Sequence, residues 1–290
     1  MKDAPFLHAV EYGAYRVLAA KARLLPHGAA RRLGVGLGRF GYGLLASRRR
    51  RALANLELAL PDADPRRRRR WARQSFETLG AQLLDVLSVT RFDAVRMCER
   101  WSLEGWEHLE VGGPDGRPSL LMTAHLGFWE ILPLAIGLYQ GGTAIVVRPL
   151  DNPRLERAIS GARTRFGGSI IAKRGAARGM LRTLSAGGRV SILIDQRPGP
   201  GEGIPVPFFG HPALTSPLLA RMALRFELPV QPCFGYPEPG GRYRLVFREP
   251  IPPDGDDAAA LTGRYIAAVE REVRQAPGLW LWMHDRWRAA

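Results

Sequence analysis

The sequence predicts an α/β protein whose sheet follows a basic, helical N-terminal region. With 46% hydrophobic and 24% charged residues, the 290-residue chain is globular in composition and can bury a full core. From about residue 100 onward, short apolar runs alternate with helix-length stretches, which is typical of a sheet with helices on its faces. Because no repeat or long linker divides the chain, we expect a single α/β domain over residues 101–290 behind a helical region over residues 1–100.

The N-terminal region is predicted to hold four helices. Amphipathic periodicity places the first two at about residues 5–25 and 27–46, followed by the arginine run 48–51. A third helix ends near Pro61, and a fourth begins after the turn at Asp64-Pro65 and carries the arginine run 66–70 in its first turns. The first two helices suit either a membrane interface or an ordinary two-helix cap on a soluble core, and the second arginine run suits a solvated face.

A glycine motif in the second helix resembles a dinucleotide-binding fingerprint but is rejected. "GLGRFG" supplies Gly36, Gly38 and Gly41, yet the residues before it, "HGAARRL", are not an apolar strand. Small residues that let two helices pack closely are the better interpretation.

Charge is concentrated in the first third of the chain. Residues 1–100 hold 20 Lys/Arg against 9 Asp/Glu, whereas residues 101–290 hold 22 against 18. Nearly all of these cations are arginines, which bind phosphate bidentately, although a GC-rich genome would also favour arginine over lysine. The asymmetry indicates a polyanionic partner, either nucleic acid or anionic lipid headgroups.

Targeting and redox signals are few. The N-terminus shows no signal-peptide pattern, and the best apolar stretch, residues 33–47, is short and interrupted by Arg39. Cys98 and Cys233 form neither a disulfide framework nor a metal-binding spacing, so a reducing compartment is expected and no metal site is predicted.

The predicted sheet is built from six strands with helices between them. The strands are placed at residues 119–124, 143–148, 168–172, 189–195, 229–234 and 242–248. The helices are placed at residues 129–139, 152–165, 174–186, 214–226 and 258–275.

One polar pair lies on an otherwise apolar strand–helix junction, "SLLMTAHLGFWEILPLA". If His125 lies on the turn that leaves the strand, Glu130 falls in the first turns of the next helix and can reach back to orient the imidazole. Ligands of α/β sheets bind at the carboxyl ends of strands, which favours a site here. The pair therefore predicts a general base.

Four segments in order resemble the bacterial lipid A biosynthesis (late) acyltransferase family, within the wider group of glycerolipid acyltransferases that share an HX4(D/E) motif. They are "AHLGFWE", "VVRPLDNPRLE", "ILIDQRPGPGEGIPVPFFGHPALT" and "WLWMHDRWR", and the N-terminal "RRRRALANLELALP" also fits. The resemblance implies a mixed, largely parallel sheet flanked by helices, with a helical N-terminal region that associates with the membrane.

The resemblance also implies the reaction. A fatty acyl group would pass from an acyl thioester, on acyl carrier protein or CoA, to a hydroxyl of a lipid A precursor or related glycolipid at the cytoplasmic face of the inner membrane. His125 would be the general base and Glu130 would hold its ring. No cofactor is expected beyond the thioester co-substrate, and nucleic acid is not expected as a partner.

The remaining site residues have competing interpretations. Arg148 is predicted to bind substrate phosphate, against a surface salt bridge, and Gln196 and Arg197 to face the acceptor. Asp195 is predicted to tie loops under the site or to act directly. A further group, predicted to line an acyl-chain groove or to be plain core, is Phe208, Phe209, Gly210 and Thr215.

Two other histidines are interpreted as structural. His211 has no acidic neighbour in sequence, and His284 lies between Trp282 and Trp287, which favours a packed or interfacial role.

Other functions stay open from sequence. Within the same chemistry, the acceptor could be a phosphatidylinositol mannoside, an ornithine lipid or a lysophospholipid. In a different class, the arginine runs would suit a non-enzymatic protein that binds nucleic acid or a membrane, although they lack the interleaved aromatics of a base-stacking surface.

Overall fold

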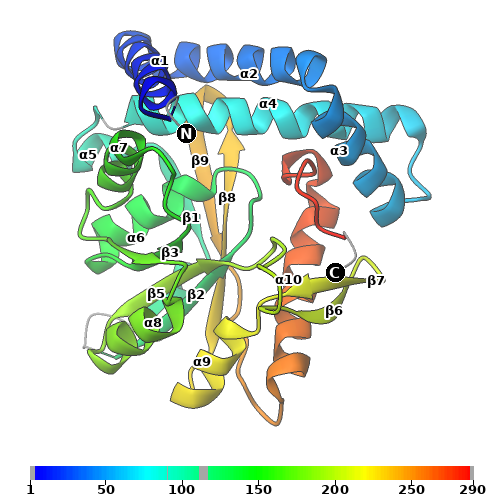
Figure 1. Cartoon of the computed structure of the whole chain (residues 1–290). Helices are drawn as coiled ribbons and strands as arrows, with labels where there is room; N and C mark the ends of the chain where they lie inside the picture. Colours follow the sequence, from blue (N-terminus) through cyan, green and yellow to red (C-terminus); the bar gives the residue numbers. More distant parts are fainter. Residues whose placement is uncertain (1–3, 90, 111–116, 288–290) are drawn as a thin grey trace.

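The computed structural model describes residues 4–89, 91–110 and 117–287. A layer of N-terminal helices lies across one end of a seven-stranded sheet, and further helices cover the faces of that sheet (Figure 1). The predicted α/β class is confirmed, including the mixed and mostly parallel sheet.

The N-terminal layer begins with two helices close to their predicted bounds. In Figure 1, α2 lies along α4, and α1 packs against both. The helices of this region are α1 (Ala4–Leu24), α2 (His27–Leu44), α3 (Ala46–Ala59), α4 (Pro65–Val89) and the short α5 (Ala94–Cys98). In the described part of the chain, none of the helices is both long and apolar enough to span a bilayer.

Glycines allow α2 and α4 to pack backbone against backbone. A Cβ atom at Gly34 would meet the carbonyl oxygen of Gly80, and one at Gly38 would meet the carbonyl oxygen of Phe76. Gly36, in contrast, has open space where its Cβ would be. The prediction of a close helix pair is therefore confirmed at Gly38, and the sequence motif belongs to the small-xxx-small type rather than to nucleotide binding.

A buried polar network joins the helical layer to the sheet. Arg31 of α2 lies 2.8 Å from Asp85 of α4, and the hydroxyl of Tyr243 donates to Asp85 at 3.0 Å. Burial raises the pKa of Asp85 to about 6, although Arg31 and Tyr243 act in the opposite direction. Since this carboxylate is fully buried, its partners fix how α2, α4 and the sheet lie relative to one another.

The main sheet has the strand order β1-β9-β8-β2-β5-β3-β4. All neighbours are parallel except β8 and β9, which are antiparallel. Its strands are β1 (Trp101–Glu104), β2 (Ser119–Thr123), β3 (Ala144–Val147), β4 (Ser169–Ala172), β5 (Arg189–Leu193), β8 (Val230–Glu238) and β9 (Arg242–Phe247). The central strand β2 is buried along its whole length between β5 and β8.

Helices connect the strands as expected, except that two of them begin differently from the prediction. The α-helices are α6 (Leu132–Gln140), α7 (Pro153–Arg163), α8 (Ala176–Ser185), α9 (Leu218–Phe226) and α10 (Ala258–Gln275). Single 3-10 turns occur at Trp106–Glu110, Trp129–Ile131, Pro239–Gly241 and Pro277–Leu279. The helix predicted from residue 129 therefore starts as a 3-10 turn, and the one predicted from residue 214 starts only at Leu218.

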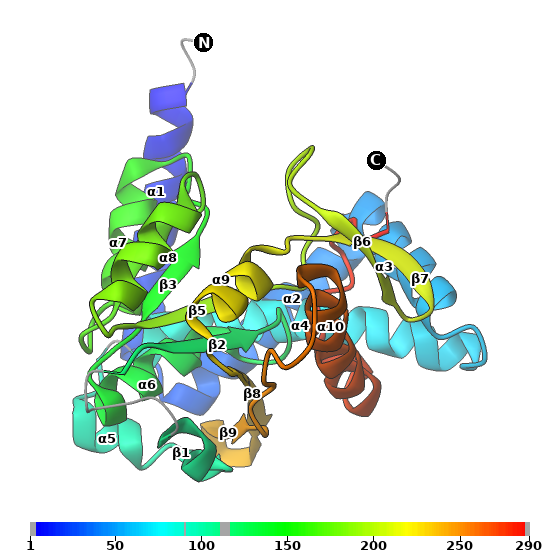
Figure 2. The ribbon, with the colours of Figure 1, turned by 90° about the horizontal axis from the view of Figure 1, so that it is seen from below.

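A separate hairpin is an element that the sequence patterns do not predict. Strands β6 (Ile204–Phe208) and β7 (His211–Thr215) pair antiparallel and lie apart from the main sheet, beside α10 (Figure 2). Gly210 makes the turn at a positive φ of 75°. This hairpin packs aromatic side chains against the C-terminal segment, which matters for the site below.

Replacing Gly38 by alanine tests the backbone contact between α2 and α4. We expect Gly38→Ala to lower the free energy of unfolding by about 1–3 kcal/mol, because α4 must move to admit the methyl group. The matched control is Gly36→Ala on the same helix, which should be neutral or stabilising by up to about 1 kcal/mol because alanine favours helix. Denaturant unfolding of both variants measures the difference, and equal effects would contradict this account of the helix pair.

Candidate active site

His125 lies two residues beyond the end of β2, at the carboxyl edge of the sheet. Its ring Nδ1 lies 2.8 Å from Oδ1 of Asp195, and its backbone N–H donates to Oδ2 of the same carboxylate at 2.9 Å. Asp195 follows β5, the neighbour of β2, so parallel pairing brings the two residues together from positions 70 apart in sequence. With the Nδ1 proton donated to Asp195, Nε2 is left with a lone pair.

The environments of the two partners differ sharply. The His125 side chain is 20% exposed, whereas that of Asp195 is 1% exposed. Burial tends to raise the pKa of Asp195, but the charge and two hydrogen bonds of His125, together with the Trp280 indole, lower it below its ordinary value. Asp195 therefore stays ionised behind a solvent-accessible imidazole, which is the arrangement of a general base with a fixed tautomer.

Glu130 does not orient His125, and this part of the sequence-based prediction is wrong. Residues 129–131 form a 3-10 turn ahead of α6, and both carboxylate oxygens of Glu130 accept from Arg163 of α7, at 2.5 and 2.7 Å. The Glu130 backbone N–H points to the side chain of Gln82 on α4. Glu130 thus ties α7 to the turn beside His125, and its charge is neutralised by a guanidinium.

The ring of Trp129 covers one side of the imidazole. The two ring centroids lie 5.0 Å apart in an edge-on arrangement. Trp129 is only partly buried, so it forms a wall of the site that also faces solvent.

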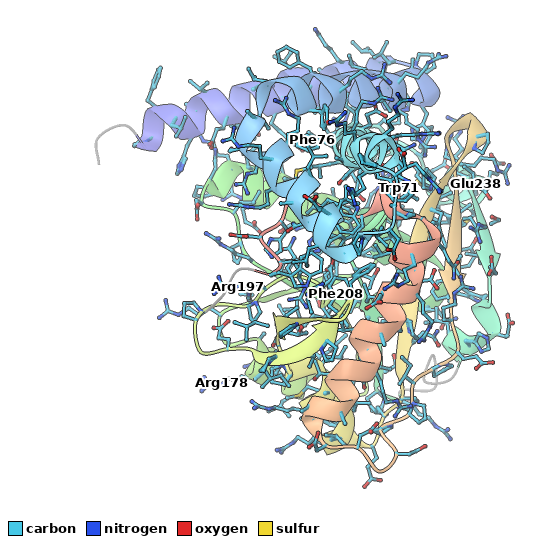
Figure 3. All side chains as sticks on the ribbon, turned by 90° about the vertical axis from the view of Figure 1, so that its right-hand side faces the viewer. Trp71, Phe76, Arg178, Arg197, Phe208 and Glu238 are labelled. Atoms are coloured by element: carbon cyan, nitrogen blue, oxygen red, sulfur yellow. The ribbon has the colours of Figure 1, made fainter. Side chains whose placement is uncertain are left out.

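The predicted substrate-binding residues fall into two groups. Arg148 follows β3, on the same carboxyl edge but separated from β2 by β5, and its exposed side chain lies 3.7 Å from Asp151. Gln196 and Arg197 directly follow Asp195 and are partly buried. Figure 3 places Arg197 nearer the edge of the molecule than Phe208.

The second group is packed rather than open. Phe208 is fully buried against Trp280 and Trp287, with ring centroids 5.5 Å away in each case. Thr215 is buried and accepts a hydrogen bond from Arg286. Of the two interpretations left open for Phe208, Phe209, Gly210 and Thr215, the packing favours core, with Gly210 at the hairpin turn.

His211 and His284 differ from each other. His211 is exposed on β7. His284 accepts a hydrogen bond at Nε2 from the backbone N–H of Arg197, at 3.0 Å, so it supports the loop that follows Asp195. Burial, reinforced by the charges of His125 and Arg286, lowers the pKa of His284 to about 4. The sequence predicts a packed or interfacial role for His284 and does not reveal this contact, since its partner lies 87 residues away.

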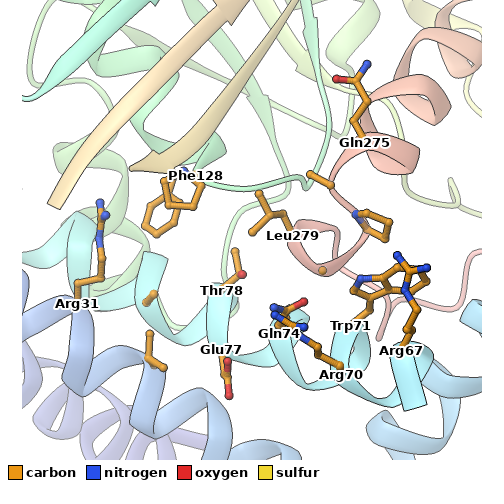
Figure 4. A pocket seen from close by; sticks show the side chains of 16 residues that line it. Arg31, Arg67, Arg70, Trp71, Gln74, Glu77, Thr78, Phe128, Gln275 and Leu279 are labelled. Atoms are coloured by element: carbon orange, nitrogen blue, oxygen red, sulfur yellow. The ribbon is translucent and has the colours of Figure 1, made fainter. Parts of the chain in front are cut away.

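A separate pocket of about 540 Å³ lies behind the His125 loop (Figure 4). It is bounded by α2, α4 and the end of α10, with Arg67 over the ring of Trp71 and with Phe128 and Leu279 on its apolar side. Neither His125 nor Asp195 lines it. The His125 loop therefore contributes Phe128 to the pocket but not its imidazole.

Fold and site together define an α/β enzyme that has a carboxylate-held histidine at the carboxyl edge of its sheet. The model of the family described as bacterial lipid A biosynthesis acyltransferase matches residues 2–289, so the chain belongs to that family and is an acyltransferase. The resemblance stated from four sequence blocks is thereby confirmed.

Individual relatives agree with this assignment. The chain is 29% identical over 271 residues to the lipid A biosynthesis lauroyltransferase of Escherichia coli (strain K12), covering 91% of this chain and 87% of that one. It is 26% identical over 273 residues to a lipid A biosynthesis acyltransferase of Haemophilus influenzae, covering 91% and 86%. Among solved structures, the 1-acyl-sn-glycerophosphate acyltransferase of Thermotoga maritima matches with a TM-score of 0.40 and 18% identity, over 68% of this chain and 82% of that one.

Acidification should loosen the support that His284 gives to the loop after Asp195. Its pKa is lowered from 6.5 to about 4 on folding, so the folded state favours the neutral ring, and the stability this contributes is full above pH 6.5 and is lost as the pH falls toward 4. We expect His284→Gln, whose amide oxygen can still accept from Arg197, to lose less thermal stability than wild type between pH 7 and pH 5. His27, whose pKa is also lowered to about 4, titrates in both proteins and cancels. An equal loss in both would contradict the role of His284.

Proposed function

We propose that this protein transfers a fatty acyl group from an acyl thioester, on acyl carrier protein or CoA, to a hydroxyl of a lipid A precursor or related glycolipid. One observation carries the mechanism: the imidazole of His125 is fixed by a buried carboxylate at Nδ1, while the His125 side chain itself is partly exposed. The relatives named as lipid A lauroyl-, palmitoleoyl- and myristoyltransferases support the acceptor class and the use of fatty acyl donors.

The reaction follows from the two nitrogens of the imidazole. Nε2 of His125 takes the proton of the acceptor hydroxyl while the hydroxyl oxygen attacks the thioester carbonyl carbon. Asp195 stabilises the imidazolium that forms, because its negative charge lies 2.8 Å from Nδ1. Collapse of the tetrahedral intermediate breaks the C–S bond, and the leaving thiolate takes the proton back from Nε2.

The developing oxyanion needs donors that the His125 loop does not offer through its backbone. The amides of residues 125, 126, 127 and 128 donate to Asp195, Ala124, Leu279 and Gly235 respectively. We therefore propose that side chains supply donors, and the arginines predicted from sequence at the same sheet edge, Arg148 and Arg197, are our candidates for binding the substrate there. Glu130 acts in this scheme by holding Arg163 and the turn beside His125, not by touching the imidazole.

Substitution of the pair tests the mechanism. We expect His125→Ala to lower kcat by about 10²–10⁴-fold and Asp195→Asn to lower it at least about tenfold, whereas Glu130→Gln should cost less than Asp195→Asn. Exposed His211→Ala is the matched histidine control. Mass spectrometry of lipids from a deletion strain complemented with each variant shows whether one acyl chain returns to one lipid class. Full return of that acyl chain in the strain complemented with His125→Ala would overturn the mechanism.

The N-terminal helices are proposed to lie on the membrane that holds the acceptor. Four apolar side chains of α2 are exposed at helical spacing, namely Leu33, Leu37, Phe40 and Leu44, and α1 exposes Phe6, Leu7, Val10, Val17 and Leu24. The exposed arginines Arg32, Arg48 and Arg50 are close in sequence to this apolar stripe. An apolar face flanked by arginine suits the interface of an anionic bilayer. The family's lipid substrates support an inner-membrane location.

Vesicle binding tests this surface by comparing two apolar side chains that are about equally exposed, one on the proposed membrane face and one elsewhere. Phe40 is 68% exposed on α2 and Val95 is 69% exposed on α5. We expect Phe40→Glu to weaken binding to anionic phospholipid vesicles by about tenfold or more, because the ring no longer enters the bilayer and a negative charge approaches the headgroups. Val95→Glu should bind nearly as wild type. Similar losses in both variants, or none in either, would contradict the proposed orientation.

A further inference from the structure

The C-terminal residues 279–286, which we call the strap, run along the loop that carries His125. The backbone N–H of Gly127 donates to the carbonyl of Leu279 at 3.0 Å, and the N–H of Leu281 donates to the carbonyl of His125 at 3.0 Å. Leu126 and Trp280 also form an antiparallel bridge. The position of the His125 backbone is therefore set by the strap as well as by β2.

The same strap reaches the loop that carries Asp195. The indole Nε1–H of Trp280 donates to Oδ2 of Asp195 at 2.7 Å, and this indole is 1% exposed. Two residues further along the loop, the amide of Arg197 donates to Nε2 of His284. One short segment thus contacts both members of the pair that we propose as general base and carboxylate.

On its other side the strap is held by buried polar side chains of the N-terminal helices. Ser75 of α4 donates from its hydroxyl to the Trp280 carbonyl at 2.5 Å and accepts from the Trp282 amide at 3.2 Å. The amide group of Asn55 on α3 donates to the carbonyls of Trp282 and His284, at 2.8 and 2.7 Å. Ser75 is 2% exposed and Asn55 is 9% exposed, so neither is available to a lipid or thioester.

We propose that Trp280, Ser75 and Asn55 are positioning residues for acyl transfer. Through its indole N–H, Trp280 orients the Asp195 carboxylate and withdraws part of its negative charge. Ser75 and Asn55 hold the strap, and the strap carries Trp280. This inference rests on the proposed function, since it assumes that His125 acts as the general base.

A change at Trp280 has a specific electrostatic consequence. The indole N–H withdraws part of the negative charge of Asp195, so its removal leaves the carboxylate a stronger partner for protonated His125. The other titratable or charged groups near the pair are His284, Asp285 and Arg286 on the strap, Arg197 after β5, and the mutually neutralised Glu130–Arg163 pair. Replacing an indole by a phenyl ring alters none of these.

The pH dependence of kcat/KM separates this role from simple packing. In Trp280→Phe we expect the acid limb of the kcat/KM profile to move to higher pH by about 0.5–1 unit, the shift that corresponds to the free energy of one hydrogen bond. Trp282→Phe is the matched control, because Trp282 is equally buried but its indole donates to the carbonyl of Pro277. Its acid limb should stay in place. The assay uses lauroyl-acyl carrier protein as donor and a lipid A precursor as acceptor.

Ser75 is tested by loss and rescue of its hydroxyl. Ser75→Ala should lower kcat about tenfold with little change in KM, because the substrate surfaces are untouched, and Ser75→Thr should restore most of it. A KM effect of the same size, or failure of threonine to rescue in a protein that melts as wild type, would show a merely structural role.

The two levels of the proposal fail in different ways. If His125→Ala is inactive but the acid limbs of Trp280→Phe and Trp282→Phe coincide with that of wild type, the positioning role of Trp280 is overturned and the proposed function stands. If His125→Ala keeps activity, the mechanism itself is overturned, whatever the tryptophan variants do.

Discussion

A carboxylate without access to water needs donors close by, and Asp195 receives them from two distant parts of the chain. His125 supplies its backbone N–H and its ring Nδ1–H, and Trp280 supplies its indole N–H. An ionised group buried without such partners would be strongly destabilising. The end of β2, the end of β5 and the C-terminal strap must therefore come together for any of them to be placed correctly.

The same requirement extends to the N-terminal helices. The hydrophobic core that contains Trp280 and Phe208 also contains Leu56 of α3 and Phe76 of α4. Those two helices supply the serine and asparagine that bind the strap. The helical layer is consequently part of the structure that supports the site, in addition to the membrane role we propose for its exposed face.

Sequence reasoning found the elements with strong periodicity and missed those decided by distant contacts. The helix at Ala258–Gln275 and the buried strand β2 lie where the apolar pattern placed them. The hairpin of β6 and β7 was missed because it holds three prolines, Pro205, Pro207 and Pro212, which are unfavourable in an internal strand but tolerated in a two-stranded edge pair.

In the site, too, local sequence patterns indicate some features, and contacts between distant residues determine the others. The location of His125 after a buried strand, together with the family resemblance of its segment, selects it as a candidate from sequence, whereas closeness in sequence selects Glu130 as its carboxylate partner. Glu130 is five residues away, yet Arg163 takes both of its oxygens. Asp195 is 70 residues away, and only the pairing of β2 with β5 brings it to the imidazole. A local spacing rule cannot express that pairing.

The two acidic groups also differ in what their charge can do. Glu130 is bound bidentately by a guanidinium, so most of its field is cancelled before it reaches the imidazole. Asp195 is bound only by N–H donors, of which the ring of His125 is the one that can become a cation. Its charge is therefore directed at the group that carries a proton in the mechanism we propose. In the mechanism we propose, the stabilisation of the imidazolium is therefore assigned on electrostatic grounds to the buried aspartate, and not to the glutamate that is nearer in sequence.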